Sequence, residues 1–225
     1  MTAVASVPSA QPRELLEDGL AQMEMPLGPA TQESLLQYIL LLEKWNKVYN
    51  LTAVRKAQRM VGLHILDSLS VFPYVLEAKR VLDVGTGGGL PGMPLAIAFA
   101  TEAPEMRITM LDTIAKKTTF VRQAISELVL KNADVVTERV EKYQPAQRFD
   151  VVISRAFAEL KDFVEGAGHL CRDDGKLLAM KGVHPFDEIG RLPPGYAVEN
   201  VIPLLVPQVE GQRHLVVIKK IPEKK

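Results

Sequence analysis

The chain reads RVLDVGTGGGLPG over residues 80–92, and this stretch decides the fold. Residues 80–84 are mostly apolar and β-branched, which predicts a short buried strand. The glycines that follow predict a tight turn, because glycine adopts backbone conformations that other residues avoid. Residues 93–100 then continue in a helix-like pattern. A strand, a glycine turn and a helix in this order commonly hold a nucleotide-like cofactor.

Strand-like and helix-like segments alternate from this stretch to residue 180. The alternation predicts a mostly parallel, doubly wound α/β sheet with helices on both faces. Two later runs, 196–205 and 214–218, flank a bend and predict an antiparallel hairpin at one edge, which makes seven strands. The other expected strands are 81–84, 107–111, 134–137, 149–153 and 176–180, and the expected helices are 93–100, 116–130 and 159–170.

The chain changes character near residue 78. Before it, apolar residues recur at helical spacing and no strand-like run interrupts them. We therefore expect a small helical N-terminal subdomain over residues 1–78. A Rossmann-like domain is expected over residues 79–225.

The composition is that of an ordinary globular protein, with 225 residues of which 47% are hydrophobic. No apolar run approaches the roughly 20 residues that span a bilayer, and the start lacks a secretion signal, so we expect a cytoplasmic protein without membrane contact. Basic and acidic residues number 27 each, so net charge gives no sign of a nucleic-acid partner. The single cysteine, Cys171, excludes an internal disulfide and a cysteine-rich metal site. We expect a monomer that binds no metal.

Two carboxylates are expected at the ends of neighbouring strands. Asp83 lies in the first strand, and Asp112 ends the next one, 27 residues after Gly85. The ribose hydroxyls of a cofactor lie at this place when its adenosine crosses adjoining strand ends. The residues predicted to bind the cofactor on this basis are Asp83, Gly85, Gly87 and Asp112.

The glycine spacing bears on which cofactor this is. In phase with the strand, Leu90 stands where a dinucleotide fingerprint has its third glycine. The out-of-phase match, Gly87 to Gly92, contains Pro91, which has no N–H to donate. A cofactor without phosphates, S-adenosylmethionine, therefore suits the loop better than NAD. A purely structural turn is the alternative.

Five segments resemble the bacterial RsmG (GidB) family, in the same order and across nearly the whole chain. They are WNKVYNLT at 45–52, HILDS at 64–68, DVGTGGGLPGMP at 83–94, SRAFA at 154–158 and RHLVV at 213–217. The resemblance implies a class I methyltransferase that uses S-adenosylmethionine. It also implies methylation of N7 of a guanine in the decoding-centre loop of 16S rRNA, either as free rRNA or within the 30S subunit.

The resemblance also assigns residues. It puts Gly85 and Leu90 in the glycine loop, Val140 and Glu141 after the third strand, and Arg155 after the fourth strand, at the cofactor and target pocket. The chain departs from the family at 115–119, where AKKTT replaces Gly-Lys-Arg followed by an apolar-Arg pair. This departure leaves open which basic residue beside Asp112 contacts RNA. We take Arg155 as the catalytic residue, and the candidates for the RNA side are Asn46, His64, Lys116, Arg122 and Lys181.

The chemistry agrees with this assignment chiefly through residues that are missing. Methylation of pyrimidine C5 needs a thiolate, but Cys171 is expected late in a helix without basic surroundings. Methylation of an exocyclic amine commonly uses an Asn/Asp-Pro-Pro-aromatic loop after the fourth strand, where this chain has SRAF at 154–157. Guanine N7 has a lone pair and no proton, so its methylation needs no general base.

Three other functions stay open: another RNA methyltransferase, an NAD-dependent oxidoreductase, and a non-catalytic RNA-binding module. The oxidoreductase shares the glycine loop, but no segment resembles a substrate domain with a hydride-transfer site. The binding module explains clustered basic residues but gives no role to the two strand-end carboxylates.

Structural alternatives also exist for individual side chains. Arg155 also fits a buried ion pair that steadies its loop, and Lys181 also fits a strand-end turn. His64 also fits a packed helix residue with Asp67 as its hydrogen-bond partner. Asn50 is well suited to end a helix. The aromatic residues Tyr38, Trp45 and Tyr49 fit the core better than base stacking, because they recur at helical spacing.

Overall fold

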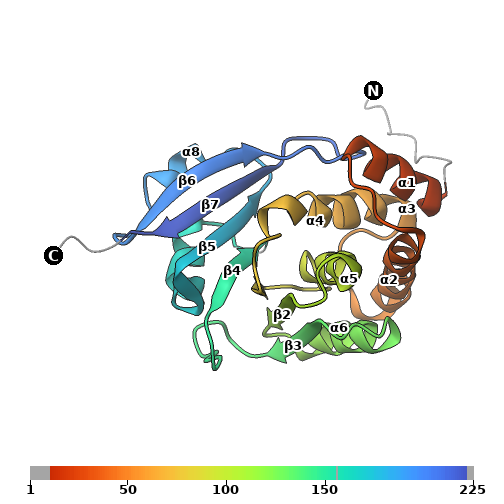
Figure 1. Ribbon diagram of the computed structural model, residues 1–225, viewed down its shortest axis with the longest axis horizontal. Helices are drawn as coiled ribbons and strands as arrows, with labels where there is room; N and C mark the ends of the chain where they lie inside the picture. The colour runs from red at the N-terminus through yellow and green to blue at the C-terminus, as the bar shows by residue number, and fades with distance from the viewer. Residues whose placement is uncertain (1–10, 156, 222–225) are drawn as a thin grey trace.

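The computed structural model describes residues 11–155 and 157–221, so Ala156 and the last lysines lie outside the described residues. At its centre is a seven-stranded sheet of order β3-β2-β1-β4-β5-β7-β6 (Figure 1). The first five strands are parallel, and β7 runs antiparallel between β5 and β6, which confirms the predicted fold class. The strands are β1 (Arg80–Val84), β2 (Arg107–Asp112), β3 (Ala133–Thr137), β4 (Phe149–Ser154), β5 (Cys171–Lys181), β6 (Tyr196–Pro203) and β7 (His214–Lys220).

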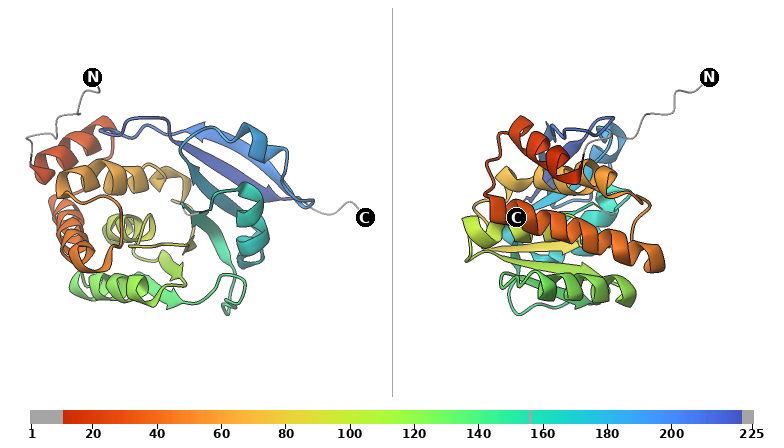
Figure 2. Two further views of the ribbon diagram at one scale, coloured as in Figure 1. Left: turned by 180° about the vertical axis from the view of Figure 1, so that it is seen from behind. Right: turned by 90° about the vertical axis from the view of Figure 1, so that its right-hand side faces the viewer.

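Helices cover both faces of the sheet. Most lie on the side that carries α5, whereas α7 covers the other side beside the hairpin of β6 and β7 (Figures 1 and 2). No described helix is long and apolar enough to cross a membrane. The helical segments are α1 (Pro12–Gln22), α2 (Pro29–Tyr49), α3 (Ala57–Met60), the π-helix η1 (Val61–Leu66), α4 (Asp67–Leu69), the 3₁₀ turn η2 (Phe72–Tyr74), α5 (Gly92–Glu102), α6 (Ala115–Glu127), α7 (Leu160–Ala167), the 3₁₀ turn η3 (Gly168–Leu170) and α8 (Phe186–Ile189).

The apolar run of β1 follows from its central place in the sheet. Val81 packs into the core on the α5 side, and Leu82 packs into the second core on the α7 side. A strand covered on both faces needs apolar residues at successive positions, and alternation is therefore lost. Asp83 follows Leu82, so its side chain points back toward α5.

The N-terminal helices brace the glycine turn. Leu35 and Leu42 of α2 belong to the same buried cluster as Val81 of the sheet. The hydroxyl of Tyr38 on α2 donates to the carbonyl of Gly88 at 2.5 Å. The core therefore continues across residue 78, and the division into two domains there stays a prediction.

Three local expectations meet the structure with different outcomes. Asn50 ends α2 in the left-handed conformation (φ 52°), which confirms its terminating role. Tyr38 and Trp45 pack into the core, but the prediction for Tyr49 is wrong because it is 41% exposed. Cys171 does not lie in a helix: it begins β5, which starts five residues before the predicted strand. The charged residues 172–174 hid this early part of the strand, since they break the apolar pattern.

Candidate cofactor and target site

The candidate site lies where the order of the sheet reverses. β2 and β3 extend from one side of β1, while β4, β5 and β7 extend from the other. In parallel α/β sheets, ligands bind beyond the carboxyl ends of the strands at such a reversal. The glycine turn after β1 and the loop after β4 both start at this edge.

The glycine turn depends on backbone conformations that favour glycine. Gly85, Gly87 and Gly89 have φ values of 71°, 60° and 94°. A Cβ on Gly89 would also lie 2.5 Å from the side chain of Met93, which leaves no room for another residue. The Gly85 N–H donates to the Leu111 carbonyl at 2.8 Å, so the turn is tied to β2. These three positions explain the glycine cluster.

Asp83 lies beneath this turn and is fully buried. Its Oδ2 accepts hydrogen bonds from the Thr86 hydroxyl (2.6 Å) and the Gly92 N–H (2.8 Å), while Oδ1 has no partner within the described residues. Burial raises the pKa of the Asp83 carboxyl to about 6, against the two hydrogen bonds and the charge of Arg155, which lower it. The carboxylate therefore shapes the turn from below, and the predicted cofactor contact of Asp83 has no open surface.

A pocket of about 300 Å³ opens between the glycine turn and the ends of β2 and β3. We call it the glycine-turn pocket. Its walls are mainly apolar, and its polar groups include Asp112, Lys117 and Glu138. The residues that line it are Val84, Gly85, Leu111, Asp112, Thr113, Ile114, Lys117, Glu138, Val140 and Phe157.

Asp112 links this pocket to the turn. One carboxylate oxygen accepts the Gly87 N–H at 2.9 Å, and the other accepts the Ile114 N–H at the same distance. The Lys117 ammonium lies 3.9 Å from the first oxygen. A carboxylate has about four acceptor sites, so these contacts leave capacity for a ligand hydroxyl.

The other predicted cofactor residues divide between the pocket and its surroundings. Val140 lines the pocket beside Gly85. Leu90 lies behind the turn in the core and does not line it. Glu141 is exposed and pairs with Arg139 (3.7 Å), whereas Glu138 lines the pocket instead.

Arg155 lies on the other side of the reversal and belongs to a buried ion-pair cluster. Its Nη1 donates to Asp67 Oδ2 at 2.8 Å and to the Leu63 carbonyl at 3.1 Å. The second carboxylate oxygen of Asp67 accepts from Nε of Arg213 at 3.0 Å. Asp67 is buried, while each arginine side chain stays about a quarter exposed (28% and 26%). One buried carboxylate thus holds two partly exposed guanidinium groups near the carboxyl ends of the strands.

These arginines line a second pocket of about 400 Å³, which we call the arginine pocket. It gathers residues from η1 and α4, from the loops after α2, β4 and β6, from the end of β5, and from the start of β7. The residues that line it are Val54, Leu63, His64, Asp67, Arg155, Met180, Lys181, Gly182, Leu204, Arg213 and His214.

His64 enters this pocket as a neutral ring. Its Nδ1 lies 2.9 Å from the Leu63 carbonyl, and its Nε2 lies 2.9 Å from the Thr52 hydroxyl. A carbonyl only accepts, so Nδ1 carries the proton and Nε2 accepts from Thr52. Burial, and then the nearby charge of Arg155, lower the pKa of His64 to about 4. The expected hydrogen bond from His64 to Asp67 is wrong, because this carboxylate binds the two arginines instead.

Asn46 and Lys181 use their polar groups within the protein. The Asn46 amide donates to the Val54 carbonyl and accepts the Thr52 N–H, both at 2.9 Å, and is buried. Lys181 donates to Glu188 at 2.7 Å and to the carbonyls of Phe157 and Ala158. Asn46 therefore closes the loop after α2, and Lys181 holds the loop that follows β4.

Lys116 and Arg122 lie apart from both pockets. They are exposed on α6 and make no ion pair within the described chain. Lys117, their neighbour, is the basic residue that reaches the glycine-turn pocket. The lining residues that had not been predicted individually include Lys117, Glu138, Phe157 and Arg213. A signal existed for Arg213, which begins the segment RHLVV used for the family resemblance.

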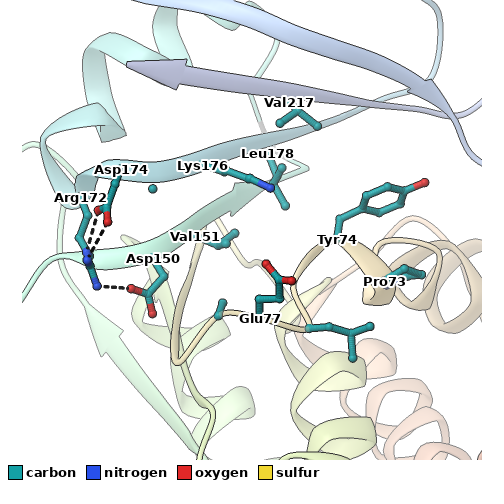
Figure 3. A pocket seen from close by; sticks show the side chains of 13 residues that line it. Pro73, Tyr74, Glu77, Asp150, Val151, Arg172, Asp174, Lys176, Leu178 and Val217 are labelled. Carbon is teal, nitrogen blue, oxygen red and sulfur yellow. Dashed lines mark hydrogen bonds and ion pairs between the residues drawn. The ribbon is translucent and has the colours of Figure 1, made fainter. Parts of the chain in front are cut away.

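A larger cavity, about 470 Å³, lies near the amino ends of β4 and β5 (Figure 3). Arg172 beside it bridges Asp150 and Asp174 at 2.8 and 2.9 Å. None of the predicted site residues lines this cavity. We therefore place the candidate site at the carboxyl ends of the strands, where the predicted residues lie, although the cavity at the amino ends is larger.

Solved structures share this architecture. An O-methyltransferase from Bacillus cereus, solved in complex with SAH, aligns with a TM-score of 0.58 and 16% identity, over 92% of this chain and all of that one. The O-methyltransferase TomG from Streptomyces achromogenes, in complex with SAM, gives 0.58 and 12%, over 94% and 99%. At these identities the likeness concerns the fold alone.

Sequence relatives are much closer. A family model described as "GidB: rRNA small subunit methyltransferase G" matches residues 31–216. "Ribosomal RNA small subunit methyltransferase G" of Chromobacterium violaceum is 52% identical over 89% of this chain and 94% of its own length. The protein of the same name from Aromatoleum aromaticum is 50% identical over 91% and 97%. The matched region contains both pockets, from the end of α2 to the start of β7, and the chain therefore belongs to the GidB family, the family of rRNA small subunit methyltransferase G.

Proposed function

We propose that this protein transfers a methyl group from S-adenosylmethionine to N7 of a guanine in the 16S rRNA of the small ribosomal subunit. The observation that carries the proposal is the family match along residues 31–216, which spans the whole carboxyl edge of the sheet. In this proposal the glycine-turn pocket holds the methyl donor and the arginine pocket holds the target nucleotide, with Arg155 beside the reversal of the sheet.

The glycine-turn pocket fits S-adenosylmethionine by the chemistry of its lining. Apolar side chains such as Leu111, Ile114 and Phe157 suit an adenine ring, and Asp112 suits the ribose hydroxyls. The carboxylates of Asp112 and Glu138 also suit a ligand that carries a positive sulfonium. Gly85 and Gly87 allow close approach of the ligand to the backbone.

The same turn does not suit the pyrophosphate of NAD. Such a group binds free N–H groups at a helix N-terminus. Here the Gly92 N–H at the start of α5 donates to Asp83, and the Met93 N–H donates to the Gly89 carbonyl. The oxidoreductase alternative therefore lacks its main binding contact.

The proposed reaction requires no proton transfer to or from a protein side chain. S-adenosylmethionine supplies an electrophilic methyl group when bound. Guanine N7 offers a lone pair and releases no proton, so no side chain has to act as a base. The protein contributes by aligning the two partners, which is worth up to roughly 7–11 kcal/mol of the barrier. Arg155, as the catalytic residue, follows the carboxyl end of β4 and orients the target guanine.

The position of Cys171 argues against a pyrimidine C5 methyltransferase. Cys171 begins β5, so it lies at the end of the sheet opposite the glycine turn. Burial raises the pKa of its thiol to about 11, which keeps it protonated at neutral pH. Such a thiol is neither placed nor charged to attack a base.

The proposed partner is the small subunit as 16S rRNA or as the 30S particle, with the protein acting as a cytoplasmic monomer. Exposed lysine and arginine side chains on α6, Lys116 and Arg122, are available for phosphate contacts. The neutral net charge favours a structured ribonucleoprotein over loose RNA, because nonspecific attraction is weak.

The test is methylation in vitro with labelled S-adenosylmethionine. Protein-free 16S rRNA and 30S subunits from a strain that lacks the gene serve as substrates, and the modified nucleotide is mapped. We expect one methyl group per 16S rRNA, at N7 of a guanine. Calorimetric titrations with S-adenosylmethionine and with NAD accompany the assay, and binding of only the former is expected. Methyl transfer to another base, or no transfer together with NAD binding, would overturn the proposal.

A further inference from the structure

In the arginine pocket, the cationic side chains outnumber the carboxylates that pair with them. Three cationic side chains line it, from Arg155, Lys181 and Arg213, against one lining carboxylate, Asp67. Lys181 is paired with Glu188, but both arginines share Asp67. Since the pKa of His64 is lowered to about 4, this ring does not add charge at neutral pH. An excess of positive charge in a pocket favours an anionic ligand.

Arg213 presents its guanidinium with part of its donors free. Nε is bound to Asp67, and Nη1 donates to the carbonyl of Gln212 at 2.8 Å. Nη2 has no partner within the described part of the chain, and the side chain is 26% exposed. The adjacent His214 lines the same pocket, is 8% exposed, and its Nδ1 has no hydrogen-bond partner there. A guanidinium held by a buried carboxylate is preoriented, so a ligand loses little entropy in ordering it.

We propose that the arginine pocket binds a backbone phosphate of the target RNA, with Arg213 as its principal ligand. This inference rests on the proposed function. A phosphate only accepts hydrogen bonds, which suits a pocket rich in N–H donors. The base edge suits the pocket less well, because a donor aimed at guanine N7 would block the attacking lone pair. Phosphate contacts fix the register of RNA on a protein, so Arg213 is a positioning residue.

The experiment compares Arg213→Gln and Arg213→Lys with the wild-type protein. The glutamine amide can still donate to Asp67 but carries no charge. The matched control is Arg107→Ala on β2, since Arg107 is exposed and its guanidinium donates to two backbone carbonyls at the amino edge. KM and kcat are measured with unmethylated 30S subunits over a range of KCl concentrations. The Kd for S-adenosylmethionine is measured by calorimetry.

For Arg213→Gln we expect a KM for 30S subunits about tenfold higher, with the Kd for S-adenosylmethionine unchanged. The slope of log KM against log[KCl] should fall by about 0.7, the value for one lost contact to single-stranded RNA. Arg213→Lys should keep the slope, because it keeps the charge. Arg107→Ala should match the wild type.

Two results of the kinetic comparison overturn the inference: a wild-type KM and salt slope for Arg213→Gln, or a Kd for S-adenosylmethionine that rises in parallel with KM. Inorganic phosphate, titrated at constant ionic strength without RNA, separates a free anion from the RNA backbone. Saturable phosphate binding that Arg213→Gln abolishes assigns the pocket to a free anion and also overturns the inference. If the wild-type protein methylates no ribosomal substrate, the proposed function fails instead.

Discussion

The two pockets at the carboxyl edge are built by different physics. The glycine-turn pocket consists of backbone turns and apolar walls, and its buried carboxylate, Asp112, is fixed by neighbouring N–H groups. The arginine pocket consists of charged side chains that meet across the fold. Asp67 binds Arg155, 88 residues away, and Arg213, 146 residues away.

This difference teaches what each pocket depends on. The first depends on local backbone conformation, because a turn after a strand needs glycine regardless of distant residues. The second depends on the placement of Asp67, at the start of α4, beside Arg155 after β4 and Arg213 before β7, because each charge is acceptable at low exposure only with its partner in place. Damage to one pocket should therefore leave the other largely intact, which can be measured.

Among the predictions, the largest expected effect is the loss of kcat in Arg155→Ala, which alters the arginine pocket. Because Arg155 is expected to orient the target, kcat should fall roughly 10²–10³-fold, as for loss of a preorganised donor. Asp67 keeps Arg213 as its partner, so the protein should stay folded by circular dichroism. Methyl transfer to 30S subunits is the measurement, with the exposed Arg107→Ala at the start of β2 as its comparison. Near-normal turnover of Arg155→Ala would leave Arg155 only the structural role of an ion-pair partner.

His64 and Asp83, one from each region, should respond to pH with opposite signs. The pKa of His64 is about 4 in the folded state against 6.5 ordinarily, so its contribution to the free energy of unfolding is lost as pH falls from about 6.5 to 4. The pKa of Asp83 is about 6 against 3.8 ordinarily, so its contribution is lost as pH rises over about 4 to 6. Each change amounts to at most roughly 3 kcal/mol.

Urea unfolding of His64→Gln and Asp83→Asn at pH 7, 5.5 and 4 tests these signs. Relative to the wild type, His64→Gln should gain stability as the pH falls, because the substitution removes a group that resists protonation. Asp83→Asn should lose relative stability over the same range, because the wild-type carboxyl gains a proton when folded. The same direction of change in both variants would contradict the environments described for these two groups.

Asp112→Asn gives the smallest effect, confined to the glycine-turn pocket. It keeps one oxygen acceptor but removes the negative charge beside the proposed ribose and sulfonium. We expect the Kd for S-adenosylmethionine to rise about tenfold, about 1.4 kcal/mol, with the KM for 30S subunits unchanged. Glu141→Gln is the matched control, since Glu141 does not line the pocket and pairs with Arg139. An equal effect of both substitutions would mean that general charge, rather than the placed carboxylate, attracts the cofactor.

Much of the fold could be predicted because its signals are local. The apolar run before Gly85 marked β1, alternating patterns marked the order of strands and helices, and Asn50 marked the end of α2. The early start of β5 at Cys171 could not be predicted in this way. Its charged residues 172–174 resemble a loop, and they lie at an irregularity between the Phe149–Cys171 and Val151–Lys176 pairs of β4 and β5.

The candidate site divides in the same manner. Gly85, Asp112 and Val140 line one pocket beyond the ends of the parallel strands, and Gly87 is tied to it through its hydrogen bond to Asp112. Asp83 was expected in the same place, yet it lies beneath the turn because residue 83 points to the α5 side of the sheet. Successive residues of a strand face opposite sides of the sheet, and this alternation, rather than the residue type, directs Asp83 away from the pocket.

The sequence by itself determined the order of the elements, the glycine turn and the family, because each is written in contiguous residues. The tertiary structure alone decided the partners of the charged side chains. It pairs Asp67 with two arginines, and it directs the buried amide of Asn46 to the backbone of Thr52 and Val54. It also bound Lys181 to Glu188. The physical reason is that a buried polar or charged group is stable only beside a partner. The partners of Asp67 lie 88 and 146 residues away, and even those of Lys181 and Asn46, seven and eight residues away, are reached only when the intervening loops fold.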